Sequence, residues 1–134
     1  MFVDASALVA IIAQEPGYEA LPDAMETVDV PLISGVAILE AVLALRRMSS
    51  GTVAEAEQFV RDALASAHAA EIAITSNVTR VAIEAYARYG KGQGHPARLN
   101  MGDCFAYACA HTYGVPLLFV GNDFAQTDIR SAMA

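Results

Sequence analysis

Hydrophobic residues along the chain fall into two kinds of segment, short continuous runs and longer stretches with helical spacing. The short runs, which we predict to be strands, cover residues 1–3, 30–33, 71–75 and 116–120, and a fifth, shorter strand is expected at 128–129. The helical stretches cover residues 6–14, 18–27, 35–48, 53–69, 77–89 and 102–113. Strands that alternate with helices are typical of an α/β protein with a mostly parallel sheet.

Capping signals stand at several of the expected helix ends. Ser34 and Ser76 occupy positions where an N-cap side chain would accept a hydrogen bond from the following helix. Thr52 precedes Glu55 with the spacing of a capping box, and Gly114 stands where a helix would end. The Ser-Ser-Gly turn ahead of Thr52 joins two consecutive helices, so we expect a helical hairpin inside the α/β arrangement.

A chain of 134 residues is long enough to build a single core, and we expect residues 1–134 to form one domain. Although 55% of the residues are hydrophobic, no apolar run approaches the ~18 residues of a membrane-spanning helix. The first residues enter a strand without a charged leader, so we expect no export signal and a cytoplasmic protein. The net charge of −7 argues against binding nucleic acid through bulk electrostatic attraction.

The two cysteines, Cys104 and Cys109, lie five residues apart in one predicted helix, so they face different directions and would form a poor disulfide. We expect both to be buried and unreactive. A zinc site would need to recruit His68, His95 or His111, but no second closely spaced pair of Cys or His completes a zinc set. We expect His68 and His111 to lie on helix surfaces or to pair with neighbours rather than to act as catalysts.

Two aspartates follow predicted strands. Asp4 comes directly after the first strand, and Asp123 lies three residues beyond the fourth. Ligands gather at the carboxyl ends of the strands in an open parallel sheet, which places both aspartates where a site would form. Each could instead serve only as the N-cap of a following helix, since Asp is a favoured N-cap residue.

Glu40 and Asp103 lie within predicted helices. Glu40 is the only charged residue between positions 35 and 45, in a helix that is apolar all round and therefore expected to be buried. A lone buried carboxylate is costly unless it is paired or bound to a metal, and neither Arg46 nor Arg47 stands three or four residues away. Asp103 opens its helix, where it would also interact favourably with the helix dipole.

Four carboxylates that converge would repel one another and raise one another's pKa unless a cation neutralises them. Sites built from oxygen ligands favour Mg²⁺ or Mn²⁺. We therefore expect a divalent-metal site formed by Asp4, Glu40, Asp103 and Asp123.

Four segments each carry one of these acids: FVDASA at residues 2–7, AILEA at 37–41, LNMGDCFAYA at 99–108 and GNDF at 121–124. In this order they resemble the PIN-domain ribonucleases, and more closely the VapC-type toxins of bacterial toxin–antitoxin pairs. The resemblance covers almost the whole chain and implies a three-layer α/β/α sandwich with a mostly parallel sheet of four or five strands. It also implies a divalent-metal endoribonuclease that cuts single-stranded or looped RNA, forms a homodimer and is neutralised by a cognate VapB antitoxin.

Carried onto this chain, the resemblance makes Asp4, Glu40, Asp103 and Asp123 the acidic quartet. We expect Asp4 and Asp103 to be the principal metal ligands, with Glu40 and Asp123 as further ligands, direct or through water. Asp128 is a candidate fifth acid. Because metal ions held by carboxylates can activate water and stabilise charge on phosphate, this set suits phosphodiester hydrolysis.

Candidate substrate contacts flank the acids. Ser6 and Asn122 are candidates for orienting the attacking water or the scissile phosphate. Lys91 and Arg98 lie in a glycine-rich loop ahead of Asp103 and are candidates for gripping RNA phosphates. This loop lacks the Gly-Lys-Ser/Thr of a P-loop and follows a helix, so the alternative is a solvated connection without a binding role.

Three other classes of protein are less consistent with the sequence than a nuclease. A receiver domain would need a lysine after a late strand, and residues 116–123 contain none. A haloacid-dehalogenase-type phosphatase would need a second aspartate two residues after Asp4, where Ser6 stands. A non-catalytic PIN-fold binding module would show eroded acids, whereas all four are present here.

The helices expected at 18–27, 35–48 and 53–69 carry more apolar surface than one small core needs. We expect a groove among them to receive an amphipathic segment of the antitoxin, which would also bring a basic side chain to the acids. The alternative is that these residues fill the core or a homodimer contact. The side chains behind this expectation are Leu21, Met25, Phe59, Val60 and Leu64.

Overall fold

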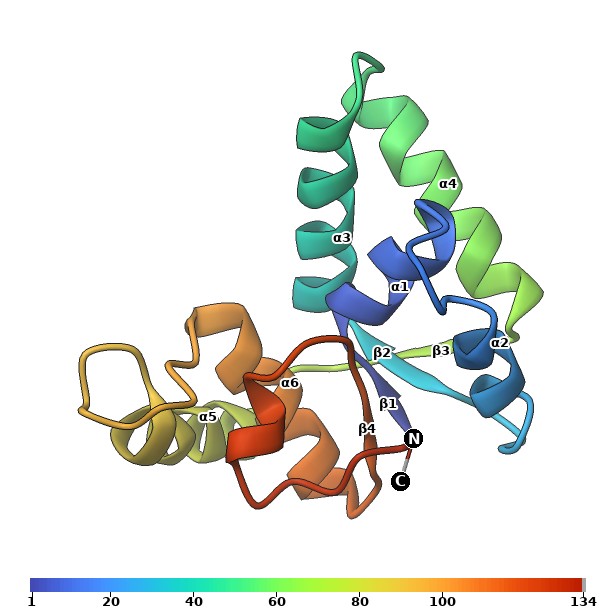
Figure 1. Ribbon diagram of the computed structural model, residues 1–134. Coiled ribbons are helices and arrows are strands. Elements are labelled where there is room, and N and C mark those ends of the chain that lie inside the picture. The colour runs from blue at the N-terminus through green and yellow to red at the C-terminus, as the bar shows by residue number, and fades with distance from the viewer. Residues whose placement is uncertain (134) are drawn as a thin grey trace.

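Four short parallel strands form the centre of the computed structural model, which describes residues 1–133 (Figure 1). The strands are β1 Phe2–Val3, β2 Leu32–Ser34, β3 Ala70–Ile72 and β4 Leu117–Leu118. They stand in the order β3-β2-β1-β4, with Phe2 paired to Leu32 on one side and to Leu117 on the other. β1 is therefore an inner strand, and its carboxyl end places Asp4 in the middle of one edge of the sheet.

Helices cover both faces of this sheet. The helical segments are α1 Ala5–Ile12, α2 Ala20–Met25, α3 Gly35–Met48, α4 Val53–Ser66, α5 Ser76–Tyr89, α6 Met101–Tyr113 and the 3-10 turn η1 Phe124–Gln126. The first four helices lie on one face, and α5 and α6 lie on the other (Figure 1). The three-layer α/β/α sandwich with a parallel sheet is thereby confirmed.

The two faces of the central strands belong to two separate cores. Val3 and Leu118 pack with α1, α3 and α4, whereas Phe2 and Leu117 pack with α5 and α6. All four side chains have 0% of their surface exposed. Adjacent strand residues point to opposite faces, so even a two-residue strand can join both helical layers to the sheet.

Most helix ends follow the signals in the sequence. Ser34 caps α3, and Thr52 and Glu55 form the expected capping box at the start of α4. The cap of α5 is Thr75 instead of Ser76, and the hydroxyl of Thr75 accepts a hydrogen bond from the first turn. Ser76 is consequently the first helical residue, one position earlier than predicted.

Several predicted elements differ from the structure at their ends, and the two largest departures are at residues 128–129 and 18–27. No strand forms at 128–129, and the chain instead meets β4 through a single parallel bridge between Leu117 and Ser131. The helix expected at 18–27 is the shorter α2, which begins two residues later. Pro22 explains the late start, because a proline lacks the N–H that a helix interior requires and is tolerated only in the first turn.

Both cysteines are buried and form no disulfide, as expected. Burial raises the pKa of the Cys104 and Cys109 thiols to about 11, so the reactive thiolate is disfavoured near neutral pH. The His111 ring stacks on Tyr107, with ring centroids 5.8 Å apart, and His68 is exposed just beyond α4. Neither histidine lies in the pocket formed by Asp4, Glu40 and Asp103 at the carboxyl end of β1.

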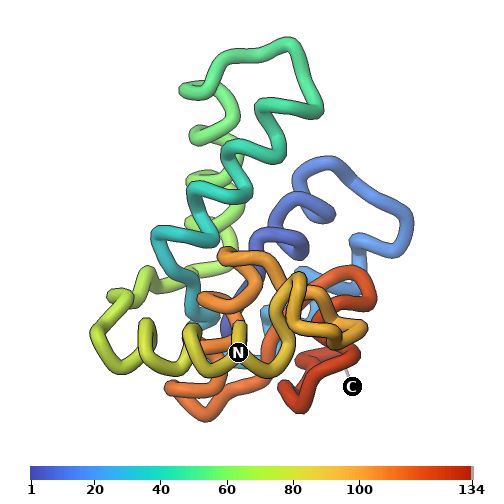
Figure 2. The backbone as a smooth tube through the Cα atoms, turned by 90° about the vertical axis from the view of Figure 1, so that its left-hand side faces the viewer, coloured from blue at the N-terminus to red at the C-terminus, as the bar shows by residue number. Residues whose placement is uncertain are grey.

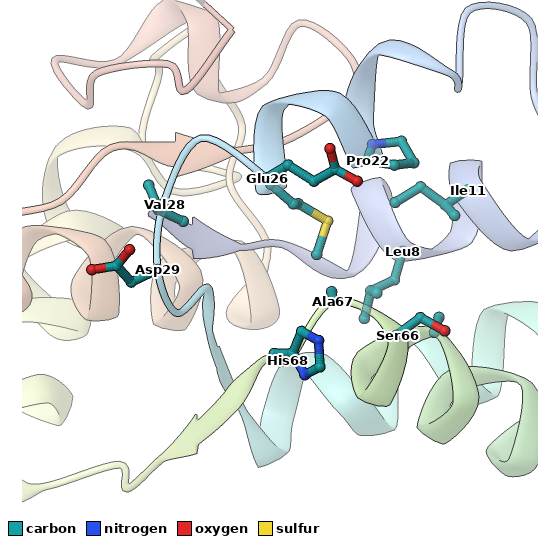
Figure 3. Close-up of a pocket in the computed structure, with 11 residues that line it drawn as sticks. Leu8, Ile11, Pro22, Glu26, Val28, Asp29, Ser66, Ala67 and His68 are labelled. Atoms are coloured by element: carbon teal, nitrogen blue, oxygen red, sulfur yellow. The ribbon is translucent and has the colours of Figure 1, made fainter.

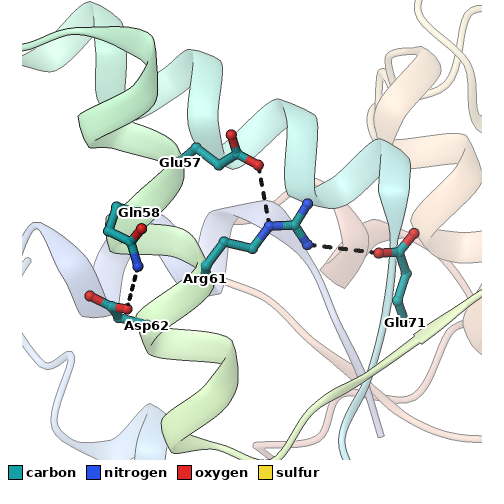
Figure 4. Close-up of polar contacts among 5 residues, drawn as sticks. All are labelled: Glu57, Gln58, Arg61, Asp62 and Glu71. Atoms are coloured by element: carbon teal, nitrogen blue, oxygen red, sulfur yellow. Dashed lines mark hydrogen bonds and ion pairs between the residues drawn. The ribbon is translucent and has the colours of Figure 1, made fainter.

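α3 and α4 form a hairpin that extends away from the sheet, as both Figure 1 and Figure 2 show. Arg61 on α4 reaches Glu57 in its own helix at 3.3 Å and Glu71 in β3 at 3.9 Å (Figure 4). All three side chains are about half exposed, so these pairs add little stability and mainly align α4 with the sheet edge. None of the described helices is long and apolar enough to cross a membrane.

Candidate acidic active site

A pocket of about 550 Å³ opens at the carboxyl end of β1, where α1, α3 and the start of α6 meet. Asp4, Ser6, Glu40 and Asp103 all line it. Asp4 and Ser6 are close in the chain, whereas Glu40 and Asp103 come from two distant helices, α3 and α6. The structure therefore brings together three of the four predicted acids and the predicted hydroxyl.

Asp4 is the N-cap of α1 as well as a wall of the pocket. Its Oδ2 accepts hydrogen bonds from the Ser6 N–H at 3.0 Å and from the Ser6 hydroxyl at 2.6 Å. The residue is only 4% exposed. Burial raises the pKa of Asp4, the Ser6 hydrogen bonds oppose the shift, and the charge of Asp123 adds to it. The capping role and the predicted site role are therefore compatible in one side chain.

Ser6 links the first acid to the loop after β4. Its hydroxyl donates to Asp4 and also accepts a hydrogen bond from the Val120 N–H at 3.0 Å. A hydroxyl has one donor and two acceptor positions, so one acceptor position is left for water or phosphate. The loop held in this way continues directly to Asp123.

Glu40 projects from α3 into the pocket. Its Oε1 is buried and has no hydrogen-bond partner within the described part of the chain. Burial, and then the charges of Asp4 and Asp103, raise the pKa of Glu40 to about 7. The described residues contain no ion pair between Glu40 and an arginine, in agreement with the spacing argument. Glu40 is thus a carboxylate whose neighbours disfavour its charge.

Asp103 forms a capping box at the start of α6. Its Oδ2 accepts a hydrogen bond from the Asn100 N–H at 3.0 Å, while the Asn100 side chain accepts one from the Asp103 N–H at 2.8 Å. Burial raises the pKa of Asp103 to about 6, and the charges of Asp4 and Asp123 add to the shift. As with Asp4, a helix-capping carboxylate also faces the pocket.

Asp123 and Asn122 are exposed residues of the loop that follows β4. Neither is among the residues that line the pocket. The charge of Asp123 nevertheless raises the pKa of both Asp4 and Asp103, which places its carboxylate near both. The fourth acid therefore lies outside the pocket lining but close enough to interact electrostatically with Asp4 and Asp103, and Asn122 precedes it in the chain.

Lys91 and Arg98 are not brought to the pocket. Both are exposed in the loop between α5 and α6, and neither belongs to the lining. The loop is fixed to its neighbours, because the Lys91 N–H donates to the Leu99 carbonyl and the Tyr86 hydroxyl donates to the Lys91 carbonyl. Their predicted contact with RNA phosphates stays a prediction.

Asp128, the candidate fifth acid, is held by residues of α5 and α6. Its Oδ1 accepts a hydrogen bond from the Tyr107 hydroxyl at 2.6 Å, and its Oδ2 lies 3.6 Å from Arg88 Nη1. The Tyr107 hydrogen bond and the Arg88 charge lower the pKa of Asp128 despite partial burial. Both oxygens thus have partners that fasten the segment after η1, and Asp128 is absent from the pocket lining.

Gly102 is a site residue that sequence reasoning missed. A Cβ atom at this position would overlap the carboxylate of Glu40. α6 can therefore start beside α3 only because residue 102 has no side chain. A glycine in the first turn of a helix, directly before a candidate acid, was the available signal, since glycine weakens a helix unless close approach requires it.

We expect Gly102→Ala to displace Glu40 and to lower the melting temperature, although alanine is the better helix former. The physical reason is the overlap between the new methyl group and the Glu40 carboxylate. Thermal unfolding of the parent, Gly102→Ala and the double variant Gly102→Ala with Glu40→Ala measures the effect. Partial recovery in the double variant is expected, and a single variant as stable as the parent would contradict the close contact.

The donor set fits a hard divalent cation. The pocket offers carboxylate oxygens, one of them buried without a partner, and burial followed by mutual repulsion raises the pKa values of Glu40 and Asp103. No three Asp, Glu, His or Cys side chains within residues 1–133 stand close enough to enclose an ion by themselves. Mg²⁺ is usually held by one or two carboxylates, with water and substrate phosphate completing its shell, so the arrangement suits an ion shared with a phosphate substrate.

A second cavity, of about 570 Å³, lies between α1, α2 and α4 (Figure 3). Leu8, Ile11 and Met25 contribute apolar side chains, while Glu26 and Asp29 add acidic groups. The predicted antitoxin groove needs correction at this point. Among its five expected residues, Phe59 is exposed and the other four, of which only Met25 also lines the cavity, are buried in the core: Leu21, Met25, Val60 and Leu64.

The parallel three-layer fold and the ordered acids agree with a known protein family. The PIN domain family matches residues 1–130, and the chain belongs to this family. Within it, the chain is 42% identical to a VapC ribonuclease of Rhizobium meliloti (strain 1021), over 96% of this chain and 98% of the relative. It is 39% identical to ribonuclease VapC42 of Mycobacterium tuberculosis, over 98% of both chains.

Solved structures share the fold at lower sequence identity. VapC20 of Mycobacterium tuberculosis, described as a sarcin–ricin loop cleaving toxin, superposes with a TM-score of 0.73 at 16% identity, covering 96% of this chain and 95% of that one. A toxin–antitoxin complex from Klebsiella pneumoniae gives a TM-score of 0.66 at 19% identity, covering 92% and 89%. At these identities the likeness concerns the fold.

Proposed function

We propose that this protein is the toxin of a type II toxin–antitoxin pair and acts as an endoribonuclease on single-stranded or looped RNA in the cytoplasm. The observation that carries the proposal is the pocket in which Asp4, Glu40 and Asp103 converge, with the charge of Asp123 acting on two of them. The similarity to VapC ribonucleases over nearly the whole chain supports the same function. A non-catalytic PIN-fold module or a receiver-like signalling domain is the alternative, and the intact acids argue against the former.

The four acids have different tasks in this proposal. Asp4 and Asp103 are the principal ligands of Mg²⁺ or Mn²⁺, because each is fixed by a cap and faces the pocket. Glu40 and Asp123 are further ligands of the metal, directly or through water. When bound, the metal would lower the pKa of a water molecule and stabilise charge on the scissile phosphate. Ser6 and Asn122 orient the water or that phosphate.

Purified protein free of antitoxin should cut RNA in the presence of Mg²⁺ or Mn²⁺ and stop in EDTA. Mapping of new 5′ ends after induced expression would test the activity and identify the cleaved RNA in one experiment. Cleavage that continues undiminished in EDTA would contradict the metal-dependent mechanism. Absence of any cleavage by folded protein with either metal would favour the binding-module alternative.

The antitoxin partner is proposed to dock at the cavity between α1, α2 and α4. Its apolar floor with Glu26 and Asp29 nearby suits an amphipathic segment that carries basic residues (Figure 3). Phe59, which is 60% exposed, stands one helical turn before the lining residue Ala63 on the same face of α4. In this proposal the antitoxin also extends a basic side chain to the acidic pocket.

Phe59→Asp should weaken the toxin–antitoxin complex by about 10-fold or more, because a buried aromatic contact is replaced by an unpaired charge. Val53→Asp is the matched control, since Val53 is 54% exposed on a different face of the same helix. Co-expression with the neighbouring small reading frame, followed by titration calorimetry, measures both affinities. Equal binding by the two variants would place the antitoxin elsewhere.

A homodimer is proposed to form through the apolar surface of α5 and the start of α6. Ile83 is 66% exposed and Met101 is 73% exposed, and both line a shallow hollow with Tyr86 and Phe105. Exposed apolar patches of this kind are typical of protein interfaces. Equilibrium sedimentation of the parent and of Ile83→Asp would measure whether this surface holds two copies together.

A further inference from the structure

One cationic side chain, Arg47, lines the acidic pocket at a distance from the three candidate acids Asp4, Glu40 and Asp103. The lining extends along α1 and α3 from Asp4 and Glu40 as far as Glu15 and Arg47. Arg47 is the only Lys, Arg or His among the residues that form this lining. The pocket is therefore a groove with a strongly acidic end and a more distant end where Arg47 and Glu15 supply one positive and one negative charge.

The α3 wall of this groove is a single face of the helix. Glu40, Leu43, Ala44 and Arg47 follow the i, i+3, i+4, i+7 spacing, and all four line the groove. At 1.5 Å per residue, Arg47 stands roughly 10 Å along the helix axis from Glu40. Leu43 is 43% exposed, and Val9 of α1, which lies beside α3 in Figure 1, lines the same groove. An apolar stretch therefore separates the acids from Arg47.

The Arg47 guanidinium has no carboxylate partner within the described part of the chain. Three other arginines form ion pairs, namely Arg61, Arg80 and Arg88, whereas Arg47 forms none within 4.0 Å, even though Glu15 shares its groove. Arg47 is also exposed to solvent. Its charge is consequently available to an anion that enters the groove.

We propose that this groove binds the single-stranded RNA flanking the cleavage point, and that Arg47 contacts a phosphate adjacent to the scissile one. This inference rests on the proposed function, because it assumes that the scissile phosphate lies at the acidic end. The guanidinium matches phosphate geometry, and the apolar stretch at Leu43 accepts the face of a base. Within this pocket Arg47 thus supplies the positive charge for RNA, since Lys91 and Arg98 do not line it.

Arg46 provides a matched control that distinguishes an RNA-binding role of Arg47 from a role in helix stability. Both arginines lie in the last turn of α3, where either would stabilise the helix dipole. Arg46 donates a hydrogen bond to the Ser49 carbonyl at 3.3 Å and does not line the groove. Arg46→Gln therefore removes the same charge from the same helix end and leaves the groove unchanged.

Cleavage kinetics and RNA binding test the inference together. We expect Arg47→Gln to raise the KM for a short single-stranded RNA by about 10-fold and to keep kcat within roughly 2-fold of the parent. The reason is that the variant loses one charge-assisted hydrogen bond that the parent makes equally in the ground state and in the transition state. Arg46→Gln should match the parent in both constants. RNA binding is measured by fluorescence anisotropy in an Asp103→Asn background at several salt concentrations. The slope of log binding constant against log salt concentration should be smaller in magnitude by about 0.7 in the Arg47→Gln variant, the value for one phosphate contact.

Equal effects of the two substitutions, or an unchanged salt slope, would overturn the assignment. Loss of antitoxin affinity without loss of RNA affinity in Arg47→Gln would overturn it as well, because the groove would then serve the protein partner. A parent protein that cuts no RNA contradicts the proposed function itself. A parent that cuts RNA while Arg47→Gln matches it contradicts only the role of Arg47.

Discussion

Asp103→Asn is expected to lower the rate of RNA cleavage by about 100-fold or more while leaving the fold intact. A metal ligand contributes several kcal/mol to the transition state, and each 1.4 kcal/mol corresponds to about tenfold in rate. The asparagine oxygen can still accept the Asn100 N–H, and the Asp103 N–H donor to Asn100 belongs to the backbone, so the capping box survives. The charge is removed and the local shape is kept.

Asp62→Asn is the matched control for this measurement. Asp62 is an exposed helix carboxylate that accepts a hydrogen bond from the Gln58 side chain at 2.7 Å, seen in Figure 4. Single-turnover cleavage and thermal unfolding should show Asp62→Asn equal to the parent in both properties. If Asp103→Asn retains parent activity, Asp103 is a helix cap alone, and the assignment of the principal ligands is wrong.

Glu40→Gln is expected to abolish most cleavage and, in the absence of metal, to stabilise the protein above pH 7. The pKa of Glu40 is raised from 4.5 to about 7 in the folded protein, mainly by burial. Between these values the folded protein keeps a proton that the unfolded chain has released, so the free energy of unfolding falls as pH rises through this window. Glutamine cannot ionise, and the variant avoids that loss.

Thermal unfolding in EDTA between pH 4.5 and 8 tests this prediction. The parent should lose more stability than Glu40→Gln as the pH rises toward about 7, because only the raised pKa values of Asp4 and Asp103 still act in the variant. At pH 7.5 the variant should melt several degrees higher than the parent. Glu84→Gln, an exposed control on α5, should retain the parent profile, and a Glu40→Gln profile that also follows the parent would contradict the raised pKa.

Added Mg²⁺ or Mn²⁺ should reverse the order of stability at pH 7.5. A ligand that binds only the folded state raises its stability according to its concentration relative to Kd. The parent should gain more than Glu40→Gln, because the variant lacks one negative charge in the pocket. A carboxylate that costs stability without its cation is typical of groups retained for function.

The sequence alone determined the fold class and the order of elements, and it singled out the candidate acids. Strand and helix patterns are local, since periodicity and capping residues act within a few positions, and this is why Ser34 and Thr52 marked helix starts correctly. Asp4 and Asp103 could be chosen because they stand at strand ends or helix starts, and Glu40 because it interrupts an apolar helix. Tertiary structure is not needed for these inferences.

Only the tertiary structure decided which residues share a surface. Leu21 and Val60 are apolar residues of predicted helices, as Phe59 is, yet they are buried in the core. Burial depends on how α2 and α4 are rotated against the rest of the fold. Asp128 pairs with Tyr107 and Arg88 of two other helices instead of lining the pocket. Gly102 and Arg47 gain their importance from α6 and α1 packing against α3. Such contacts join positions distant in the chain, so local patterns carry no information about them.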